Sequence, residues 1–297
     1  MKTISNNARV CFVGDSITAN NGYISYIQSF YYENCQNSGI KFYNCGVSGG
    51  NAATQLTYFD DDTARHNPTH VFIMLGVNDS WRDRLGTPKS KARYDLLVER
   101  YEIFKKNLEK LYQKAKSTGA EVIFMTPPPY AEYMESETPA FPGAYALIQG
   151  YADHVKSFAL SKGCDLVDVH GYLTVKMQEE NLYNPDRVHP TEKGHYHIAS
   201  CILNELGFEN GEYAPIPSYM DELRSKVQAL RHIYFGELII IGNYTLPLEE
   251  KRKKVEDYLA TPSPAFEIQA KAFLEHVNNK EQLYKDVEEI LCKGFEK

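Results

Sequence analysis

Between residues 8 and 207, short apolar segments alternate with longer amphipathic ones, and this alternation restricts the fold more than any other feature. The short segments are hydrophobic on both faces, which is typical of parallel strands covered by helices. We expect strands over 9–13, 40–45, 70–75, 121–126 and 164–169. We expect helices near 22–36, 51–65, 90–117, 144–161 and 191–206. This order predicts an α/β fold, a three-layer α/β/α sandwich with a parallel, five-stranded, flavodoxin-like sheet.

The pattern changes after residue 207. A proline-containing stretch, 213–218, is followed by amphipathic segments that predict helices near 219–235, 248–260, 264–277 and 280–292. The apolar stretch 238–241 suits either a strand or a buried connector. We therefore expect a catalytic domain over 1–212 and a mostly helical C-terminal extension over 213–297. A lid, a dimer interface and a stabilising wrap are all compatible with such an extension.

Composition excludes several classes of partner. The net charge is −7, and the one cluster of basic residues, 251–254, lies between acidic ones, so no nucleic-acid partner is expected. Residues 1–7 lack the apolar core of a signal peptide, and no apolar run approaches the roughly 20 residues that span a bilayer. The six cysteines are scattered without a Cys-x-x-Cys pair, which favours free thiols. These features predict a cytoplasmic protein without a membrane span.

Ser16 stands directly beyond the first predicted strand, after a turn that Gly14 permits. In open α/β sheets, ligands bind at the carboxyl ends of the strands. A serine there can be a nucleophile, or it can simply cap the helix that follows. Three further segments, 46–51, 75–79 and 184–190, follow later strands or precede the last helix. In a parallel sheet all of them gather at the same edge as Ser16.

The chemistry of these segments is complementary. A serine hydroxyl is a weak nucleophile until a base takes its proton, and His189 is the candidate base. Asp186, three residues earlier, can reach the other ring nitrogen of His189 and fix its tautomer. The Ser16 and Gly49 backbone N–H groups and the Asn78 side-chain amide could stabilise the negative charge that develops on an ester carbonyl oxygen.

Taken together, these residues resemble the sequence blocks of the GDSL/SGNH hydrolases. The blocks are Gly14-Asp15-Ser16-Ile17, then Gly49, then Gly76-x-Asn78-Asp79, then Asp186-x-x-His189-Pro190. The resemblance implies Ser16 as nucleophile, Gly49 and Asn78 as oxyanion donors, and His189 as base with Asp186 supporting it. It covers about 8–207 and does not extend to the C-terminal extension. Ile17 stands where the family name has leucine.

Other residues near the blocks are weaker candidates for a role in the site. We expect Asp15 and Asp79 to support the site by fixing loops. For both residues, a purely structural role is at least as good an interpretation as a direct part in the chemistry. Aromatic residues of the loops at the same edge are candidates for lining the substrate pocket, namely Trp81, Tyr130, Tyr133 and Phe141. His195 and His197 follow His189, but residues two apart on a helix do not share a face, so no metal site is expected.

The sequence thus predicts a serine esterase that acts through an acyl-enzyme on a small-molecule ester and needs no cofactor. We favour a short-chain or acetyl ester, for example on a carbohydrate. The alternatives are a thioesterase or lysophospholipase with the C-terminal helices as an acyl lid, and a non-catalytic ligand-binding protein that retains the fold. The C-terminal helices could also join two copies in a homo-oligomer.

Overall fold

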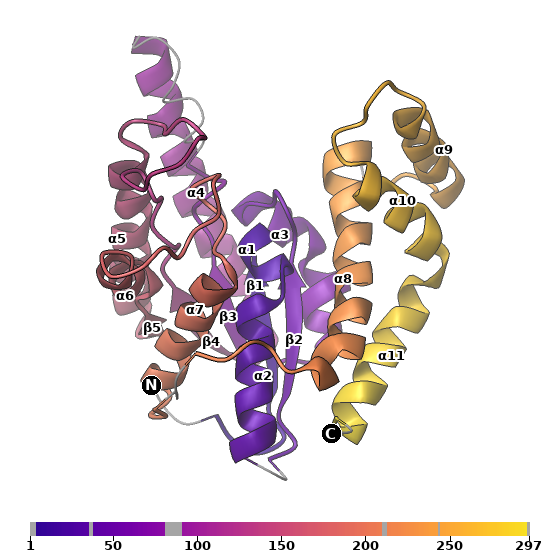
Figure 1. Ribbon diagram of the computed structural model, residues 1–297, viewed down its shortest axis with the longest axis horizontal. Helices are drawn as coiled ribbons and strands as arrows, with labels where there is room; N and C mark the ends of the chain where they lie inside the picture. The colour runs from indigo at the N-terminus through magenta and orange to yellow at the C-terminus, as the bar shows by residue number, and fades with distance from the viewer. Residues whose placement is uncertain (1–3, 36–37, 81–90, 210–212, 243, 296–297) are drawn as a thin grey trace.

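The computed structural model describes residues 4–35, 38–80, 91–209, 213–242 and 244–295 (Figure 1). A sheet of five strands lies at its centre, and each neighbouring pair is parallel. The strands are β1 (Arg9–Gly14), β2 (Lys41–Gly46), β3 (His70–Met74), β4 (Glu121–Met125) and β5 (Asp165–Val167). Their spatial order is β2-β1-β3-β4-β5, so the expected flavodoxin-like arrangement is confirmed.

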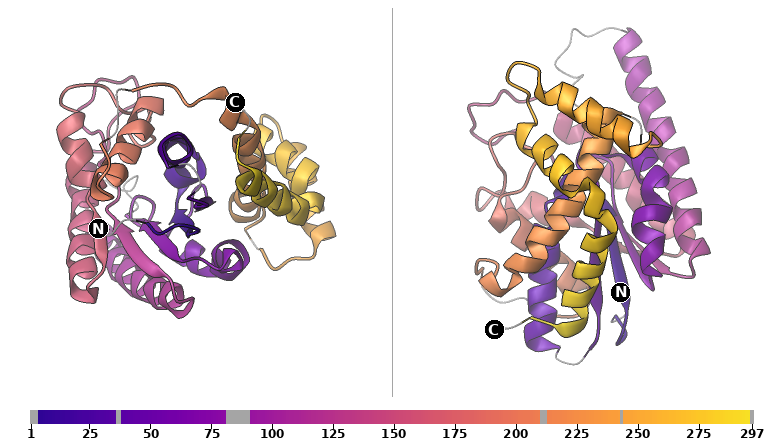
Figure 2. Two further views of the ribbon diagram at one scale, coloured as in Figure 1. Left: turned by 90° about the horizontal axis from the view of Figure 1, so that it is seen from below. Right: turned by 90° about the vertical axis from the view of Figure 1, so that its right-hand side faces the viewer.

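Helices cover both faces of the sheet (Figures 1 and 2). They are α1 (Ser16–Ala19), α2 (Gly22–Asn34), α3 (Ala52–Tyr58), α4 (Lys91–Ser117), α5 (Ala144–Lys162), α6 (Val169–Lys176) and α7 (Glu192–Glu205). Along β1, Val10 and Phe12 join the core beneath α2 and α7. Cys11 and Val13 join a second core beneath α4 and α5. Because both faces of the strand are buried, its sequence is continuously apolar rather than alternating.

Two expected elements differ from the observed ones. Within the helix expected over 51–65, the α-helix ends at Tyr58. The chain then forms a π-helical turn, η1 (Phe59–Thr63), and a short 3-10 turn, η2 (Ala64–His66). The last strand is shorter than expected because the Asp168 side chain accepts the Gly171 N–H and begins α6, a helix that the sequence did not predict.

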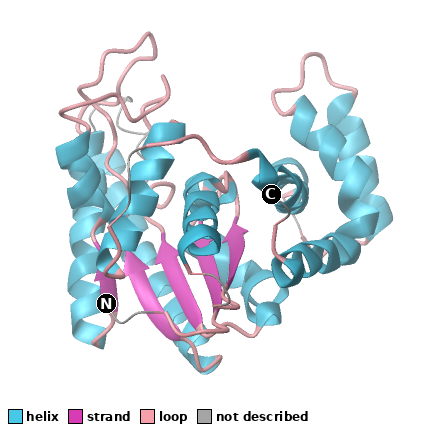
Figure 3. Ribbon diagram, turned by 60° about the horizontal axis from the view of Figure 1, so that its bottom comes forward, coloured by secondary structure: helices cyan, strands magenta, loops and turns pink. Residues whose placement is uncertain are grey.

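The C-terminal region is helical, as expected. It consists of a short 3-10 turn η4 (Ser218–Met220), α8 (Asp221–Phe235), η5 (Gly236–Ile241), α9 (Leu248–Leu259), α10 (Glu267–His276), η6 (Val277–Asn279) and α11 (Lys280–Lys293). The stretch 238–241 is neither a strand nor a fully buried connector, because η5 continues α8 as a π-helical turn in which Ile239 is partly exposed. The region lies beside β2, the edge strand of the sheet (Figures 1 and 3).

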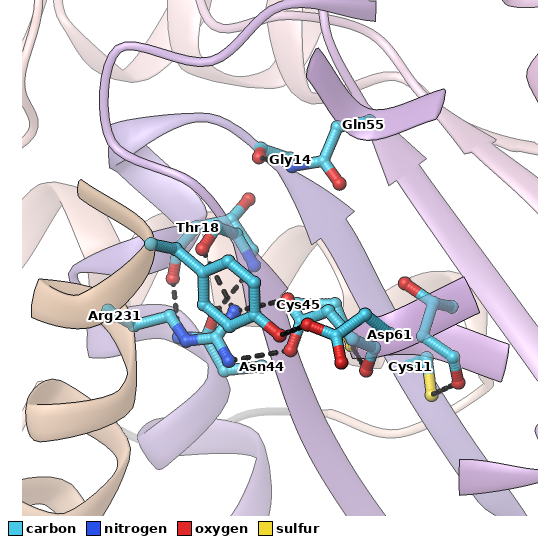
Figure 4. A network of polar contacts seen from close by, with 12 residues as sticks. Cys11, Gly14, Thr18, Asn44, Cys45, Gln55, Asp61 and Arg231 are labelled. Carbon is cyan, nitrogen blue, oxygen red and sulfur yellow. Dashed lines mark hydrogen bonds and ion pairs between the residues drawn. The ribbon is translucent and has the colours of Figure 1, made fainter. Parts of the chain in front are cut away.

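A buried ion pair joins this region to the sheet. The Arg231 guanidinium of α8, labelled in Figure 4, makes several polar contacts. It donates to the Asp62 carboxylate over 2.5 and 2.7 Å and to the Gly46 carbonyl oxygen over 3.1 Å. The Tyr284 hydroxyl of α11 donates to the same carboxylate over 2.6 Å. Arg231 and Asp62 are both almost fully buried, so solvent screens their attraction little.

No helix in the described part of the chain is both long enough and apolar enough to cross a bilayer.

Candidate active site

Ser16 is the first residue of α1, directly beyond the carboxyl end of β1. The capping role belongs to its neighbour, because the Asp15 carboxylate accepts the Ile17 N–H over 3.0 Å. The turn needs glycine at position 14, since a β-carbon there would lie 2.1 Å from Thr18 Oγ1. The Ser16 side chain is therefore left free of the helix start.

Two buried amides, which the sequence did not single out, hold this turn (Figure 4). Asn44 of β2 donates to the Thr18 carbonyl oxygen over 2.7 Å, and Gln55 of α3 donates to the Gly14 carbonyl oxygen over 2.5 Å. Both amides come from elements adjacent to β1. They fix the backbone on either side of Ser16.

The Ser16 hydroxyl is connected to Asp186 through His189. Ser16 Oγ lies 2.8 Å from His189 Nε2, and His189 Nδ1 lies 2.6 Å from Asp186 Oδ2. With the Nδ1 proton donated to the carboxylate, Nε2 of a neutral imidazole is free to accept the serine proton. The structure thus brings together the three residues that the sequence proposed as a triad.

Asp186 is held by its own loop. Burial alone would raise the pKa of its carboxyl group, but the N–H groups of His189 and Val188, each 2.9 Å from Oδ1, and the His189 ring lower it below the usual value. The carboxylate is therefore ionised at neutral pH and can orient the histidine and stabilise its protonated form.

The loop that carries Asp186 and His189 is fixed by Arg187, a residue that the sequence reasoning missed. Arg187 is 5% exposed, and its guanidinium donates to the carbonyl oxygens of Ala131 over 3.1 Å and Thr138 over 2.9 Å. Its backbone φ is +68°, a left-handed conformation that non-glycine residues rarely adopt. The motif spacing gives no signal for Arg187 because its partners lie in another loop.

Gly49 and Asn78 lie in neighbouring loops that are bonded together. The Asn78 side-chain amide donates to the Gly50 carbonyl oxygen over 2.9 Å, which leaves its second N–H for another acceptor. Gly49 has a φ of +76°, a conformation that favours glycine. These are the two groups that the sequence proposed, with the Ser16 N–H, as donors to an oxyanion.

Asp79 supports this arrangement by joining two loops. Its Oδ1 accepts the Ala52 N–H over 3.1 Å, which links the Asn78 loop to the start of α3. Burial raises the pKa of the Asp79 carboxyl group to about 7. The negative charge of Asp15 adds to this increase, and the hydrogen bond from the Ala52 N–H opposes it. The two aspartates therefore occupy structural positions beside the proposed catalytic residues.

The aromatic residues proposed for the pocket are dispersed. Tyr130 is 1% exposed, and its hydroxyl accepts the Phe141 N–H over 3.1 Å, so Tyr130 belongs to the core rather than to a pocket wall. Phe141 is half-buried against that core. Tyr133 is 82% exposed and lines a cavity of about 590 Å³ between its loop and the segment 177–183 that follows α6, and Ser16 is not part of the lining. Trp81 lies outside the described residues.

The two histidines of α7 do not form a metal site with each other. His195 is buried against Tyr23, and His197 is bonded to Glu180. Within the described ranges, no three His, Cys, Asp or Glu side chains are grouped to hold a metal ion.

Comparisons with known proteins agree with this geometry. A family model described as the GDSL-like Lipase/Acylhydrolase family matches residues 12–196. An acetylxylan esterase from Geobacillus stearothermophilus is 28% identical over 225 residues, which make up 69% of this chain and 97% of that protein.

Solved structures share the fold. A catalytic mutant of an acetylxylan esterase from Geobacillus stearothermophilus, with one serine replaced by alanine, has a TM-score of 0.59 at 25% identity and covers 72% of this chain and 100% of its own. A gut microbial diltiazem-metabolizing enzyme has a TM-score of 0.64 at 24% identity over 70% of this chain. The match spans only 48% of that enzyme, and at this identity it shows a common fold alone.

Proposed function

This chain belongs to the GDSL-like lipase/acylhydrolase family and is an esterase, and we propose that it removes acetyl or other short acyl groups from a small or carbohydrate ester through an acyl-enzyme on Ser16. The observation that carries the proposal is the continuous chain of short contacts from Ser16 Oγ through His189 to Asp186.

Acylation begins when Ser16 Oγ attacks the ester carbonyl carbon and its proton passes to His189 Nε2. The negative charge that forms on the carbonyl oxygen is stabilised by the Ser16 and Gly49 N–H groups and the free N–H of the Asn78 amide. Each such donor contributes about 3 kcal/mol to transition-state stabilisation. The tetrahedral intermediate then collapses, and His189 returns the proton to the departing alcohol oxygen.

Deacylation repeats these steps with water in place of serine. His189 takes a proton from the water as the water oxygen attacks the acyl carbon, and the proton then passes to Ser16 Oγ as the acid leaves. Asp186 remains ionised throughout and offsets the positive charge on the imidazole. Each step uses only protein groups and water.

The preference for acetyl esters on carbohydrates is supported by the acetylxylan esterases to which the chain is similar. The nucleophilic role of Ser16 is supported by the serine-to-alanine relative, which is described as a catalytic mutant. The location of Ser16 at the carboxyl edge of a parallel sheet is a second, independent support.

The test compares wild type and Ser16→Ala on p-nitrophenyl acetate, p-nitrophenyl decanoate and acetylated xylo-oligosaccharides, with mass spectrometry of protein treated with a fluorophosphonate. We expect acetate release by wild type alone and a single adduct on Ser16. Hydrolysis that survives in Ser16→Ala would overturn the mechanism. A wild-type preference for decanoate over acetate would instead favour the long-chain alternative.

A further inference from the structure

The C-terminal region reaches the proposed oxyanion loop. Ile239 of η5 lies against Gly49, so closely that a β-carbon on Gly49 would sit 2.7 Å from Ile239 Cδ1. The family match ends at residue 196, before η5 begins. A residue from outside the matched region therefore contacts a glycine proposed to bind the carbonyl oxygen of the substrate.

Ile239 is not a simple core residue. It is 41% exposed, so much of its apolar side chain faces solvent although the residue also borders Gly49. Beside it, α3 and η5 enclose a cavity of about 310 Å³, whose lining includes Thr54, Tyr58 and Leu238. Neither Gly49 nor Ile239 lines this cavity, so the contact between them, rather than the cavity, joins the C-terminal region to the proposed site.

The strand order indicates which part of an ester this wall faces. Gly49 follows β2 on one side of Ser16, whereas the His189 loop is bonded to Ala131, which follows β4 on the other side. The alcohol oxygen must face His189 to receive its proton. The carbonyl oxygen is held by the Gly49 N–H, so the acyl substituent takes the remaining direction, away from His189 and past the Gly49 loop that Ile239 borders.

The turn that carries Ile239 is firmly held. The buried Glu237 carboxylate lies 2.6 Å from Lys251 Nζ of α9. Gly236 packs so tightly that a β-carbon there would meet the Phe273 ring at 2.5 Å. Arg231, which precedes this turn in α8, bonds the end of β2. These contacts fix the backbone that carries Ile239. A side chain that limits the space for a substrate needs such a fixed position.

We infer that Ile239 is a specificity-determining residue that limits the length of the acyl group. The inference rests on the proposed function, because it assumes that Gly49 binds the carbonyl oxygen and that Ser16 is acylated. It assigns to the C-terminal region a direct part in substrate selection.

The test measures kcat/KM of wild type, Ile239→Ala and Ile239→Val on p-nitrophenyl acetate and p-nitrophenyl hexanoate, which share a leaving group. We expect the hexanoate-to-acetate ratio to rise on the order of tenfold in Ile239→Ala and by less in Ile239→Val, because each freed methylene position relieves a steric limit of that size. Ile268→Ala, which changes a 75% exposed isoleucine of α10, is the matched control and should leave the ratio unchanged.

An unchanged ratio in both Ile239 variants, with Ser16-dependent acetate hydrolysis intact, would overturn the inference and leave the proposed function standing. The inference also fails if only the ratio between p-nitrophenyl acetate and ethyl acetate changes, because that result places Ile239 on the alcohol side. Absence of Ser16-dependent hydrolysis in wild type overturns the proposed function itself.

Discussion

His189 Nε2 and Ser16 Oγ lie 2.8 Å apart although 173 residues separate them along the chain. The contact depends on the whole sheet, since Ser16 follows β1 and the His189 loop is tied to residues that follow β4. Ser16→Ala and His189→Ala should each lower kcat on p-nitrophenyl acetate on the order of 10⁴-fold or more, because nucleophile and base act as a unit. Their thermal unfolding should match wild type. An additive loss in the double variant would contradict the pairing.

Asp186→Asn should reduce kcat on the order of 10⁴-fold, which is less than the loss expected for Ser16→Ala. The asparagine oxygen can still accept the two backbone N–H groups that Asp186 Oδ1 accepts, so the loop should keep its shape. The amide NH2 then replaces Oδ2 and donates to His189 Nδ1, so the negative charge is lost and the ring proton is shifted to Nε2, where it blocks transfer from Ser16. Steady-state kinetics alongside a fluorophosphonate labelling rate would check this, and an effect equal to that of Ser16→Ala would show that the loop had collapsed.

Asn78→Ala should lower kcat by about 10²- to 10³-fold with little change in KM, because the amide acts on charge that exists only in the transition state. Ser80→Ala is the matched control. It removes a hydrogen bond of 2.7 Å from the same loop, to the Val77 carbonyl oxygen, without touching the amide. If the two variants lost equal activity, loop order rather than oxyanion binding would explain the effect of Asn78.

Asp79 should make stability fall as pH rises from about 4 to about 7. The pKa of its carboxyl group is raised from 3.8 to about 7 in the folded protein, so the folded state holds the proton more strongly than the unfolded state does. Below pH 4 both states are protonated and burial has no electrostatic cost. Above pH 7 both are ionised, and the folded state is destabilised on the order of 4 kcal/mol.

Asp79→Asn removes this dependence while retaining an acceptor for the Ala52 N–H. Its stability advantage over wild type, measured by urea unfolding, should therefore increase between pH 4 and pH 8. Asp257→Asn, on an exposed position of α9, should show no such trend. An advantage that shrinks with rising pH would contradict the assignment.

Arg231→Met should destabilise the protein by about 3–5 kcal/mol, because it leaves the buried Asp62 carboxylate without its cation. Lys114→Met breaks an exposed pair of 2.8 Å with Asp60 and should cost less than about 1 kcal/mol. Urea unfolding of both variants provides the comparison. Equal effects would mean that Arg231 does not anchor the C-terminal region.

The sheet and the triad loop could be predicted because their signals are local. Buried parallel strands have continuous apolar sequences, and Asp186 and His189 are close in the chain. The change from α-helix to π-helical turn at Phe59 could not be predicted, since the partners of the buried Asp62, Arg231 and Tyr284, lie far away in the chain. Ser16 was correctly placed after β1, but Asp15 proved to be the cap.

The residues that the sequence did not reveal share a different property. Arg187, Arg231 and Ile239 each act on a segment far away in the chain, and nothing in their own neighbourhood marks them. The burial of Tyr130 could not be foreseen for a related reason, because a tyrosine in a proline-rich loop looks exposed until the core covers it. In both cases, the surroundings of the residue are set by contacts with segments far away in the chain.

The Arg231–Asp62 pair has a consequence for how the chain is made. All five strands have been synthesised by residue 167, yet the cation that neutralises Asp62 comes 169 residues after it. Chains fold from the N-terminus as they emerge from the ribosome. A nascent sheet therefore has an unneutralised carboxylate and an uncovered β2 edge until α8 emerges, and exposed strand edges are sites of aggregation. The C-terminal helices, the last part of the chain to emerge, are therefore also the part that completes this edge of the sheet.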